Sequence, residues 1–283
     1  MSTTDWHAHL WPRAYLDFLE AHGQGPFHQR GVPWGGDSPA MLRLRLRQMD
    51  DCGIDRQVLN SATVYPGLSS PEDDARAARL ANESLAAVAG PAPHRFAFLG
   101  VLPLAGVAAS VRELGHLMDR LGALGVVLPA SFRGASVLGP RYAPLHEELD
   151  DRRATVLYHP TGRSTGPSLS DPAALAWSAG AIAEQTTVVL DWLTAGMSER
   201  FPRIRPIVAR AGGACFLLDP ATVRDVAGST LCFDSHTHGS GAALGLAVDH
   251  VGPARLLLGS DYPFVRDAHL HTAVRGFHEA TGR

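Results

Sequence analysis

Short apolar runs alternate with longer stretches of helical spacing along the whole chain, a pattern typical of βα units around a parallel sheet. Eight such runs occur, at residues 4–7, 57–61, 96–102, 125–128, 155–159, 207–210, 231–234 and 256–260. The 283 residues of the chain suit one barrel of eight βα units. We therefore expect a single α/β domain over residues 1–283, folded as a distorted (β/α)8 TIM-type barrel.

Local signals between the runs support this reading. Ser70-Pro71-Glu72-Asp73 combines an N-cap, a proline at the first helical position and early acidic residues, and Ser170-Asp171-Pro172 repeats the pattern. Residues 23–40 contain five glycines and three prolines. We expect this segment to be a long loop over the active-site face of the barrel.

Composition excludes several classes of partner. A net charge of −3 and a pI near 6.5 give no basic surface for phosphates, so nucleic acid is not an expected partner. Three cysteines do not indicate a disulfide framework. The first residues do not resemble an export signal, and no apolar stretch approaches the roughly 20 residues of a membrane span. We expect a cytoplasmic protein with no membrane partner.

Three arginines, Arg43, Arg45 and Arg47, alternate with leucines and could be read as a nucleic-acid strip. They lie in a segment of helical spacing, and the chain has no basic surplus. We expect them to form a solvated helix face.

All 25 basic residues other than histidine are arginines, and the chain contains no lysine. A carboxylated lysine that bridges two metal ions is therefore not available, and neither is a Schiff base. Any metal site is expected to be mononuclear.

Histidines and an aspartate stand at the carboxyl ends of three predicted strands. His7 and His9 are two residues apart, so both side chains point to the same side of the pleat. His159 ends the fifth run, and Asp261 follows the eighth. In a barrel these strand ends converge on the face where active sites are built, and the four side chains form a credible ligand set for zinc or a similar ion.

The segments that carry these residues resemble the metal-dependent amidohydrolase superfamily. Asp5-Trp6-His7-Ala8-His9 resembles its opening metal motif, and Gln48-Met49-Asp50-Asp51-Cys52-Gly53-Ile54-Asp55-Arg56-Gln57-Val58 resembles the helix and strand that follow. Tyr158-His159-Pro160 and Leu258-Gly259-Ser260-Asp261-Tyr262-Pro263-Phe264 resemble the ligand segments of strand five and of the last strand. Nearly the whole chain is similar to the amidohydrolase-2 group, which includes aminocarboxymuconate semialdehyde decarboxylase and the γ-resorcylate-type decarboxylases. The resemblance implies one divalent ion, zinc or alternatively manganese, held by His7, His9, His159 and Asp261.

Arg210 departs from the pattern of the family. The resemblance implies a histidine at the end of strand six that acts as general acid or base, but Arg210 stands there, before Ala211-Gly212-Gly213. A guanidinium cannot exchange protons near neutral pH, whereas it can bind a carboxylate through two hydrogen bonds. Either His236 or His238, after strand seven, supplies the proton transfer together with Asp261, or the protein has lost the family chemistry.

Substrate contacts are predicted from the same resemblance. The decarboxylases of the group carry an arginine after strand one that holds a substrate carboxylate, and Arg30 lies near that place, with an ordinary surface charge as the alternative. Trp34 is a further candidate, with a lid or packing contact as its alternative. If Arg30 and Arg210 both face the pocket, the ligand is a small acid, because two buried guanidiniums need anionic partners.

Three functions follow as hypotheses. The first is a metal-dependent non-oxidative decarboxylase of a small unsaturated or aromatic carboxylic acid, a carboxy-lyase. The second is a hydrolase of a lactone, amide or related bond, which the same ligand set could support. The third is a non-catalytic binding protein. Family resemblance further implies a homodimer. The sequence ends at Arg283, shortly after His278, where the family continues with a further helix, so we expect a shortened last helix.

Overall fold

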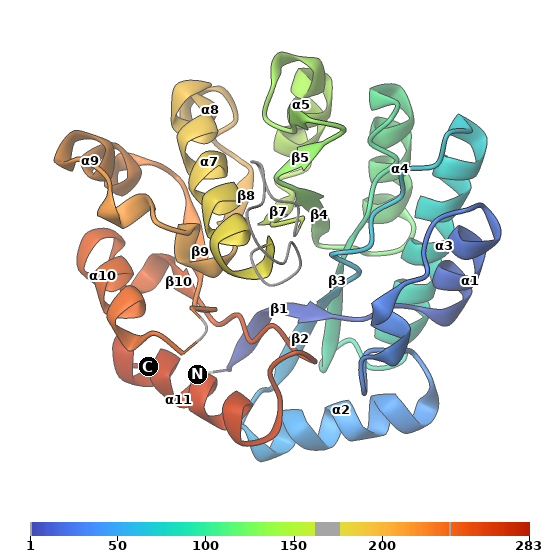
Figure 1. Ribbon diagram of the computed structural model, residues 1–283, viewed down its shortest axis with the longest axis horizontal. Helices are drawn as coiled ribbons and strands as arrows, with labels where there is room; N and C mark the ends of the chain where they lie inside the picture. The colour runs from blue at the N-terminus through green and yellow to red at the C-terminus, as the bar shows by residue number, and fades with distance from the viewer. Residues whose placement is uncertain (1, 162–175, 238) are drawn as a thin grey trace.

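Eight parallel strands form one sheet that curves into a nearly closed barrel (Figure 1). The computed structural model describes residues 2–161, 176–237 and 239–283, without the side chains of His28, Arg30 and Ala176. The strands follow one another around the sheet in chain order: β1 (Thr4–His9), β2 (Arg56–Asn60), β3 (Phe96–Gly100), β4 (Gly125–Pro129), β7 (Thr155–His159), β8 (Arg205–Val208), β9 (Cys232–Asp234) and β10 (Leu256–Leu257). The predicted single-domain barrel is confirmed, and each of these strands overlaps one of the predicted runs.

The barrel closes between its last and first strands. The Trp6 amide donates to the Leu258 carbonyl over 2.8 Å, and the His9 amide donates to the Tyr262 carbonyl over 2.6 Å. The Asp261 amide in turn donates to the His7 carbonyl over 2.9 Å. These bonds continue the ladder beyond the two residues of β10, and they fix the segment that carries Asp261 beside β1.

Helices surround the strands on the outside (Figure 1). Within the described residues they are α1 (Arg13–Ala21), α2 (Pro39–Asp51), α3 (Pro71–Ala89), α4 (Val107–Asp119), α5 (Ala143–Asp151), α7 (Ala181–Thr194), α8 (Met197–Arg200), α9 (Pro220–Gly228), α10 (Gly241–Val251) and α11 (Asp267–Thr281). The predicted cap is confirmed, since the Ser70 hydroxyl accepts from the Asp73 amide at the start of α3. The second predicted helix start, at Ser170, lies outside the described residues. No helix in the described ranges is long and apolar enough to cross a membrane.

Four local features differ from the sequence reading. A short hairpin, β5 (Ser131–Phe132) and β6 (Ala135–Ser136), follows β4 and was not predicted. The expected loop 23–40 contains the 3-10 turn His28–Gly31, and α2 already begins at Pro39. Strand β8 ends at Val208, so Arg210 opens a 3-10 turn, Arg210–Gly212, instead of ending the strand.

The expected solvated face of α2 is wrong for one of its three arginines. Arg43 and Arg47 are exposed, but Arg45 is 0% exposed because it lies on the side of α2 that packs against the barrel. Residues 45 and 49 are four positions apart, so helical periodicity places both on the inward face, and Met49 is likewise fully buried.

Gly125 allows β4 to lie against β7. Its φ is +149°, and a Cβ at this position would lie 2.0 Å from the Thr155 carbonyl oxygen. Gly125→Ala therefore forces the two strand backbones apart, and we expect a loss of about 2 kcal/mol of unfolding free energy. Urea denaturation measures this change in unfolding free energy. Gly228→Ala, where nothing lies within 4 Å of the new methyl group, is the matched control and should be near neutral; equal stability of both variants would contradict the packing argument.

Candidate metal centre

Four buried side chains meet at the carboxyl end of the barrel. His7 and His9 extend from β1, His159 ends β7, and Asp261 follows β10. One ligand atom from each lies within 4.8 Å of the other three. The structure thus brings together the four residues that the sequence selected as metal ligands.

Each histidine is oriented by a hydrogen bond at its outer nitrogen. His7 Nδ1 lies 2.6 Å from Asp234 Oδ2, and His9 Nδ1 lies 3.0 Å from Asn60 Oδ1. His159 Nδ1 donates to the Pro160 carbonyl over 2.7 Å. Because Asp234 and Asn60 are placed here as acceptors, the Nδ1 atoms carry the protons and the Nε2 lone pairs face inward.

The inward-facing atoms suit a divalent cation. His7 Nε2 and His9 Nε2 lie 3.1 Å apart, and Asp261 Oδ1 lies 2.9 Å from His9 Nε2. Two nitrogen lone pairs and a carboxylate oxygen at these distances repel one another unless positive charge lies between them. Three imidazole nitrogens and one carboxylate oxygen form a donor set that zinc and related ions accept.

Protonation preferences agree with this fit. Burial and the neighbouring imidazoles lower the pKa of His159 well below its usual range, and burial lowers the pKa of His9. Burial disfavours the ionised form of Asp261, but His236, His9 and His7 outweigh it and hold the pKa of Asp261 well below its usual range. Neutral His9 and His159 beside an ionised Asp261 are in the state in which such residues bind a metal ion. Burial disfavours the charged form of His7, but the Asp234 carboxylate outweighs it and raises the pKa of His7.

Aromatic rings form one wall of the centre. The Trp11 ring stacks on His9 with centroids 5.4 Å apart, and Phe264 meets His9 edge-on at 5.7 Å. Trp11 is fully enclosed, whereas Phe264 is exposed at the rim. The sequence reading did not select these two residues, because an aromatic residue after a strand carries no signal that separates a core residue from a site residue.

Asp234 connects the centre to two further candidate residues. It is fully buried at the end of β9. While Oδ2 contacts His7, Oδ1 accepts from the backbone amides of Arg210, over 2.8 Å, and of His236, over 3.1 Å. The Asp234 carboxylate thus contacts three predicted site residues. These are the metal ligand His7, Arg210 in place of the expected histidine, and His236, which is predicted to transfer protons. The position of Asp234 at a strand end was a signal that the sequence reading did not use.

His236 lies beside Asp261. Its Nε2 atom is 3.3 Å from Asp261 Oδ2, and its side chain is only 5% exposed. Burial lowers the pKa of His236 to about 4, although Asp261 acts in the opposite direction. The other predicted proton-transfer residue, His238, lies outside the described residues.

Arg210 points a buried guanidinium toward the same centre. The side chain is 7% exposed, and its positive charge acts on both His159 and His236. Among the described residues, neither Nε nor Nη1 of Arg210 has a hydrogen-bond partner. Burying a cation whose donors have no partner costs free energy unless an anion accepts hydrogen bonds from it.

A left-handed turn holds Arg210 in place. Four consecutive residues have positive φ: 55° at Arg210, 50° at Ala211, 73° at Gly212 and 70° at Gly213. A Cβ at Gly213 would lie 2.3 Å from the Ile182 carbonyl oxygen of α7. Non-glycine residues in this region cost of the order of 1–3 kcal/mol each and concentrate at functional sites.

The other predicted substrate contacts are less defined. Arg30 lies in the turn His28–Gly31, but its side chain is outside the described residues. Trp34 packs against the hydrophobic core, and the Arg266 guanidinium lies over its ring, 4.9 Å from the centroid. The structure thus shows packing contacts for Trp34.

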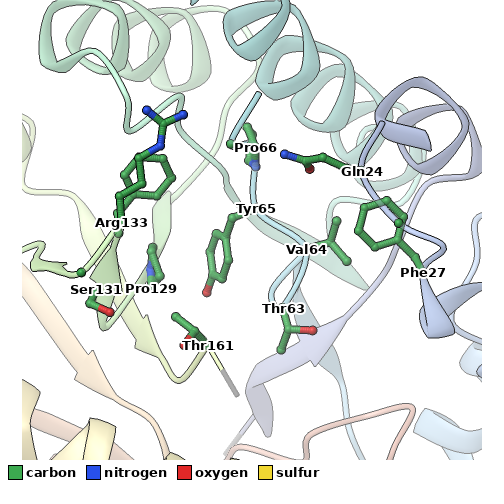
Figure 2. Close-up of a pocket in the computed structure, with 14 residues that line it drawn as sticks. Gln24, Phe27, Thr63, Val64, Tyr65, Pro66, Pro129, Ser131, Arg133 and Thr161 are labelled. Atoms are coloured by element: carbon green, nitrogen blue, oxygen red, sulfur yellow. The ribbon is translucent and has the colours of Figure 1, made fainter. Parts of the chain in front are cut away.

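A cavity of about 390 Å³ opens in the loops on the same face (Figure 2). Its lining includes Phe27 and Tyr65 as aromatic walls and Thr161, two residues after His159. Arg133, from the β5–β6 hairpin, stands at its exposed edge. Figure 2 shows the Tyr65 hydroxyl directed toward Thr161. A hollow lined by both aromatic and polar side chains suits a small organic ligand.

Relatives of the chain carry decarboxylase names. The 2-amino-3-carboxymuconate-6-semialdehyde decarboxylase of Dictyostelium discoideum is 25% identical over 297 aligned residues, which cover 92% of this chain and 81% of that protein. The 6-methylsalicylic acid decarboxylase of Aspergillus aculeatus is 28% identical over 284 aligned residues, which cover 92% and 83%.

Solved structures share the fold. A dihydroxybenzoic acid decarboxylase from a Polaromonas species, with bound manganese and the inhibitor 2-nitroresorcinol, has a TM-score of 0.77 at 19% identity. That similarity covers 100% of this chain and 91% of the other. A family model described as amidohydrolase matches residues 4–280. Because this match spans almost the whole barrel, including all four candidate ligands, the chain belongs to the metal-dependent amidohydrolase family.

Proposed function

We propose that the protein is a metal-dependent, non-oxidative decarboxylase of a small aromatic or unsaturated carboxylic acid. The observation that carries this proposal is a buried cluster of three histidines and one aspartate next to Arg210, whose guanidinium has two buried donors without a hydrogen-bond partner among the described residues. A carboxylate substrate would bind both the metal ion held by the cluster and the Arg210 guanidinium. The decarboxylase relatives, which cover more than 90% of the chain, support the same reaction class.

His7, His9, His159 and Asp261 are the proposed ligands, with zinc as the proposed ion and manganese as the alternative. A divalent ion held there would supply Lewis-acid polarisation of a substrate oxygen. The protein side chains do the rest: Asp234 and Asn60 keep the imidazole rings in place, and Trp11 and Phe264 limit water on one side.

Arg210 is the proposed binder of a substrate carboxylate, and Arg30 is the proposed second arginine for the same substrate. Trp34 is the third proposed substrate contact. It belongs to the loop 23–40, which in this proposal covers the active-site face. A guanidinium suits this task because its planar donors match a carboxylate. The cavity beside Tyr65 and Thr161 offers room for an aromatic ring.

Decarboxylation also needs one proton. The bond between the ring or chain carbon and the carboxylate breaks, its electron pair stays on the carbon, carbon dioxide leaves, and a proton must be added to that carbon. We propose that the His236 and Asp261 pair relays this proton because their side chains are 3.3 Å apart at the centre, with His238 as the other histidine of the same loop. Burial lowers the pKa of His236 to about 4, so the imidazole is neutral at rest, and it takes the proton from solvent water before passing it to the carbon.

His236→Gln is expected to lower kcat about 100-fold, the usual contribution of a positioned acid or base. Glutamine keeps a polar side chain of similar length beside Asp261, so metal content should not change. Steady-state carbon dioxide release measures the effect, and His269→Gln, an exposed histidine on α11, is the control. If His236→Gln turns over at the rate of the wild type, His236 has no part in proton transfer.

The proposed reaction is tested by metal analysis of the purified protein, followed by incubation of the metal-loaded protein with aromatic acids that carry an ortho hydroxyl group. Release of carbon dioxide with formation of the decarboxylated product is the expected result. Lactone opening or amine release without carbon dioxide would overturn it in favour of a hydrolase. Binding of acids and metal without turnover of any would favour a binding protein.

A further inference from the structure

Arg45 is a charged side chain enclosed inside the protein next to the proposed metal centre. It lies on α2, outside the barrel wall, yet it is 0% exposed. Burial lowers the pKa of Arg45 to about 10, which still leaves the guanidinium charged at neutral pH. Among the described residues, no carboxylate forms an ion pair with Arg45, so other groups must stabilise its charge.

Three contacts surround the guanidinium. Nη1 donates to Gln57 Oε1 over 3.0 Å, and Nη2 donates to the backbone carbonyl of His9 over 2.5 Å. The ring of Tyr262 lies under the guanidinium carbon, 4.4 Å from its centroid. A carbonyl dipole, an amide dipole and an aromatic face are all favourable partners for a cation that water does not reach.

Gln57 passes the interaction on to a buried carboxylate. Its Nε2 donates to Asp5 Oδ2 over 2.9 Å, so the neutral amide lies between the positive Arg45 and the acidic Asp5. Asp5 also accepts from the Ser260 hydroxyl over 2.6 Å and from the Ser260 amide over 3.0 Å. Arg45, Gln57, Asp5 and Ser260 are all enclosed at 0% exposure, and together they form what we call the Arg45 chain.

Both ends of the Arg45 chain reach proposed metal ligands. One end fixes the carbonyl of His9 itself. The other fixes Ser260, the residue before Asp261, while Tyr262 follows Asp261 and packs on the guanidinium. The Arg45 chain therefore spans the seam where β10 closes against β1, and His9 and Asp261 lie on opposite sides of that seam.

We propose that Arg45 is a positioning residue that sets the distance between His9 and Asp261 across the barrel seam and thereby tunes metal binding. This inference rests on the proposed metal centre. A guanidinium suits the task because its fork reaches β1 and β2 at the same time and its flat face meets Tyr262. A lysine ammonium offers a point charge and no flat face.

Arg45→Met tests the proposal because methionine fills similar space without donors. Its matched control is Arg255→Met. Arg255 is half-buried and, like Arg45, has no ion pair among the described residues. It precedes β10, away from the proposed ligands, and donates to the Ser229 and Ala227 carbonyls over 2.7 Å each. Manganese titration of each metal-free protein gives the Kd, and the visible absorption of the cobalt-loaded protein reports ligand geometry.

We expect Arg45→Met to raise the Kd for manganese about 10- to 100-fold, the usual effect of losing a group that orients metal ligands, and to shift the cobalt spectrum. Arg45→Lys should fall between Arg45→Met and the wild type. Arg255→Met should lower thermal stability and leave both metal readouts unchanged.

A folded Arg45→Met protein with the wild-type Kd and cobalt spectrum would overturn the proposal, as would an equal rise in Kd for Arg255→Met. If Arg45→Met does not fold, Gln57→Met removes the middle of the Arg45 chain, and an unchanged Kd there would overturn the proposal as well. A wild-type protein that binds no metal would instead overturn the proposed function itself, so the two failures are distinguishable.

Discussion

Replacing His7 and His9 together by alanine is expected to reduce bound metal from about one equivalent to none and to abolish decarboxylation. The two residues supply two of the four inward-facing donors, and their Nε2 atoms are 3.1 Å apart. A single histidine and Asp261 cannot retain a divalent ion against water at ordinary concentrations. Elemental analysis of the purified variant, with carbon dioxide release on the same sample, measures both effects.

His146→Ala is the matched control for this double variant. His146 is also almost fully buried, and its Nδ1 bonds to the Tyr142 carbonyl over 3.0 Å, but it lies outside the ligand cluster. We expect lower stability with metal content unchanged. One equivalent of metal in the His7 and His9 variant would show that the ion is held elsewhere and would remove the basis of the proposed reaction.

Arg210→Met is expected to lower kcat/KM for a carboxylate substrate about 1,000-fold, which corresponds to about 4 kcal/mol for a buried charge pair that loses one partner. The free Nε and Nη1 donors are removed, while the backbone amide that bonds to Asp234 remains. Metal content should therefore stay at the wild-type level. Arg210→Lys keeps the charge without the fork, and we expect it to recover only part of the loss.

A phenolic product analogue without a carboxylate provides the internal control. If Arg210 binds the carboxylate, the affinity of this analogue should be the same for Arg210→Met and the wild type. Equal loss of affinity for the analogue and for the acid would mean that the variant disturbs the pocket as a whole. Unchanged kcat/KM for the acid would contradict the assignment of Arg210 to substrate binding.

Arg45 shows where a reading of the chain alone fails. Its alternation with leucines and its neighbours Arg43 and Arg47 predict a solvated helix face. Burial of a charge becomes acceptable only when several distant partners surround it, and here these are Gln57 on β2, the His9 carbonyl on β1 and the Tyr262 ring after β10. None of the three is adjacent to Arg45 in sequence.

Asp234 illustrates the same limit within the site. A buried aspartate at a strand end is visible in the sequence, but its role depends on the simultaneous contact with His7, Arg210 and His236. The left-handed turn at Arg210 is likewise decided by packing against α7 and β9. The glycines at 212 and 213 permit such a turn, but they do not say which way the arginine side chain will point.

The sequence by itself determined the barrel, because eight apolar runs separated by helix-length stretches leave few other ways to bury the apolar residues. It also determined the candidate ligands, because parallel strands bring their carboxyl ends to one face whatever their exact bounds. Only the tertiary structure decided the orientation of each imidazole, the free donors of Arg210 and the burial of Arg45. Strand ends follow from local patterns, whereas a hydrogen bond between residues 227 positions apart, such as that of His7 with Asp234, exists only when the whole barrel has closed.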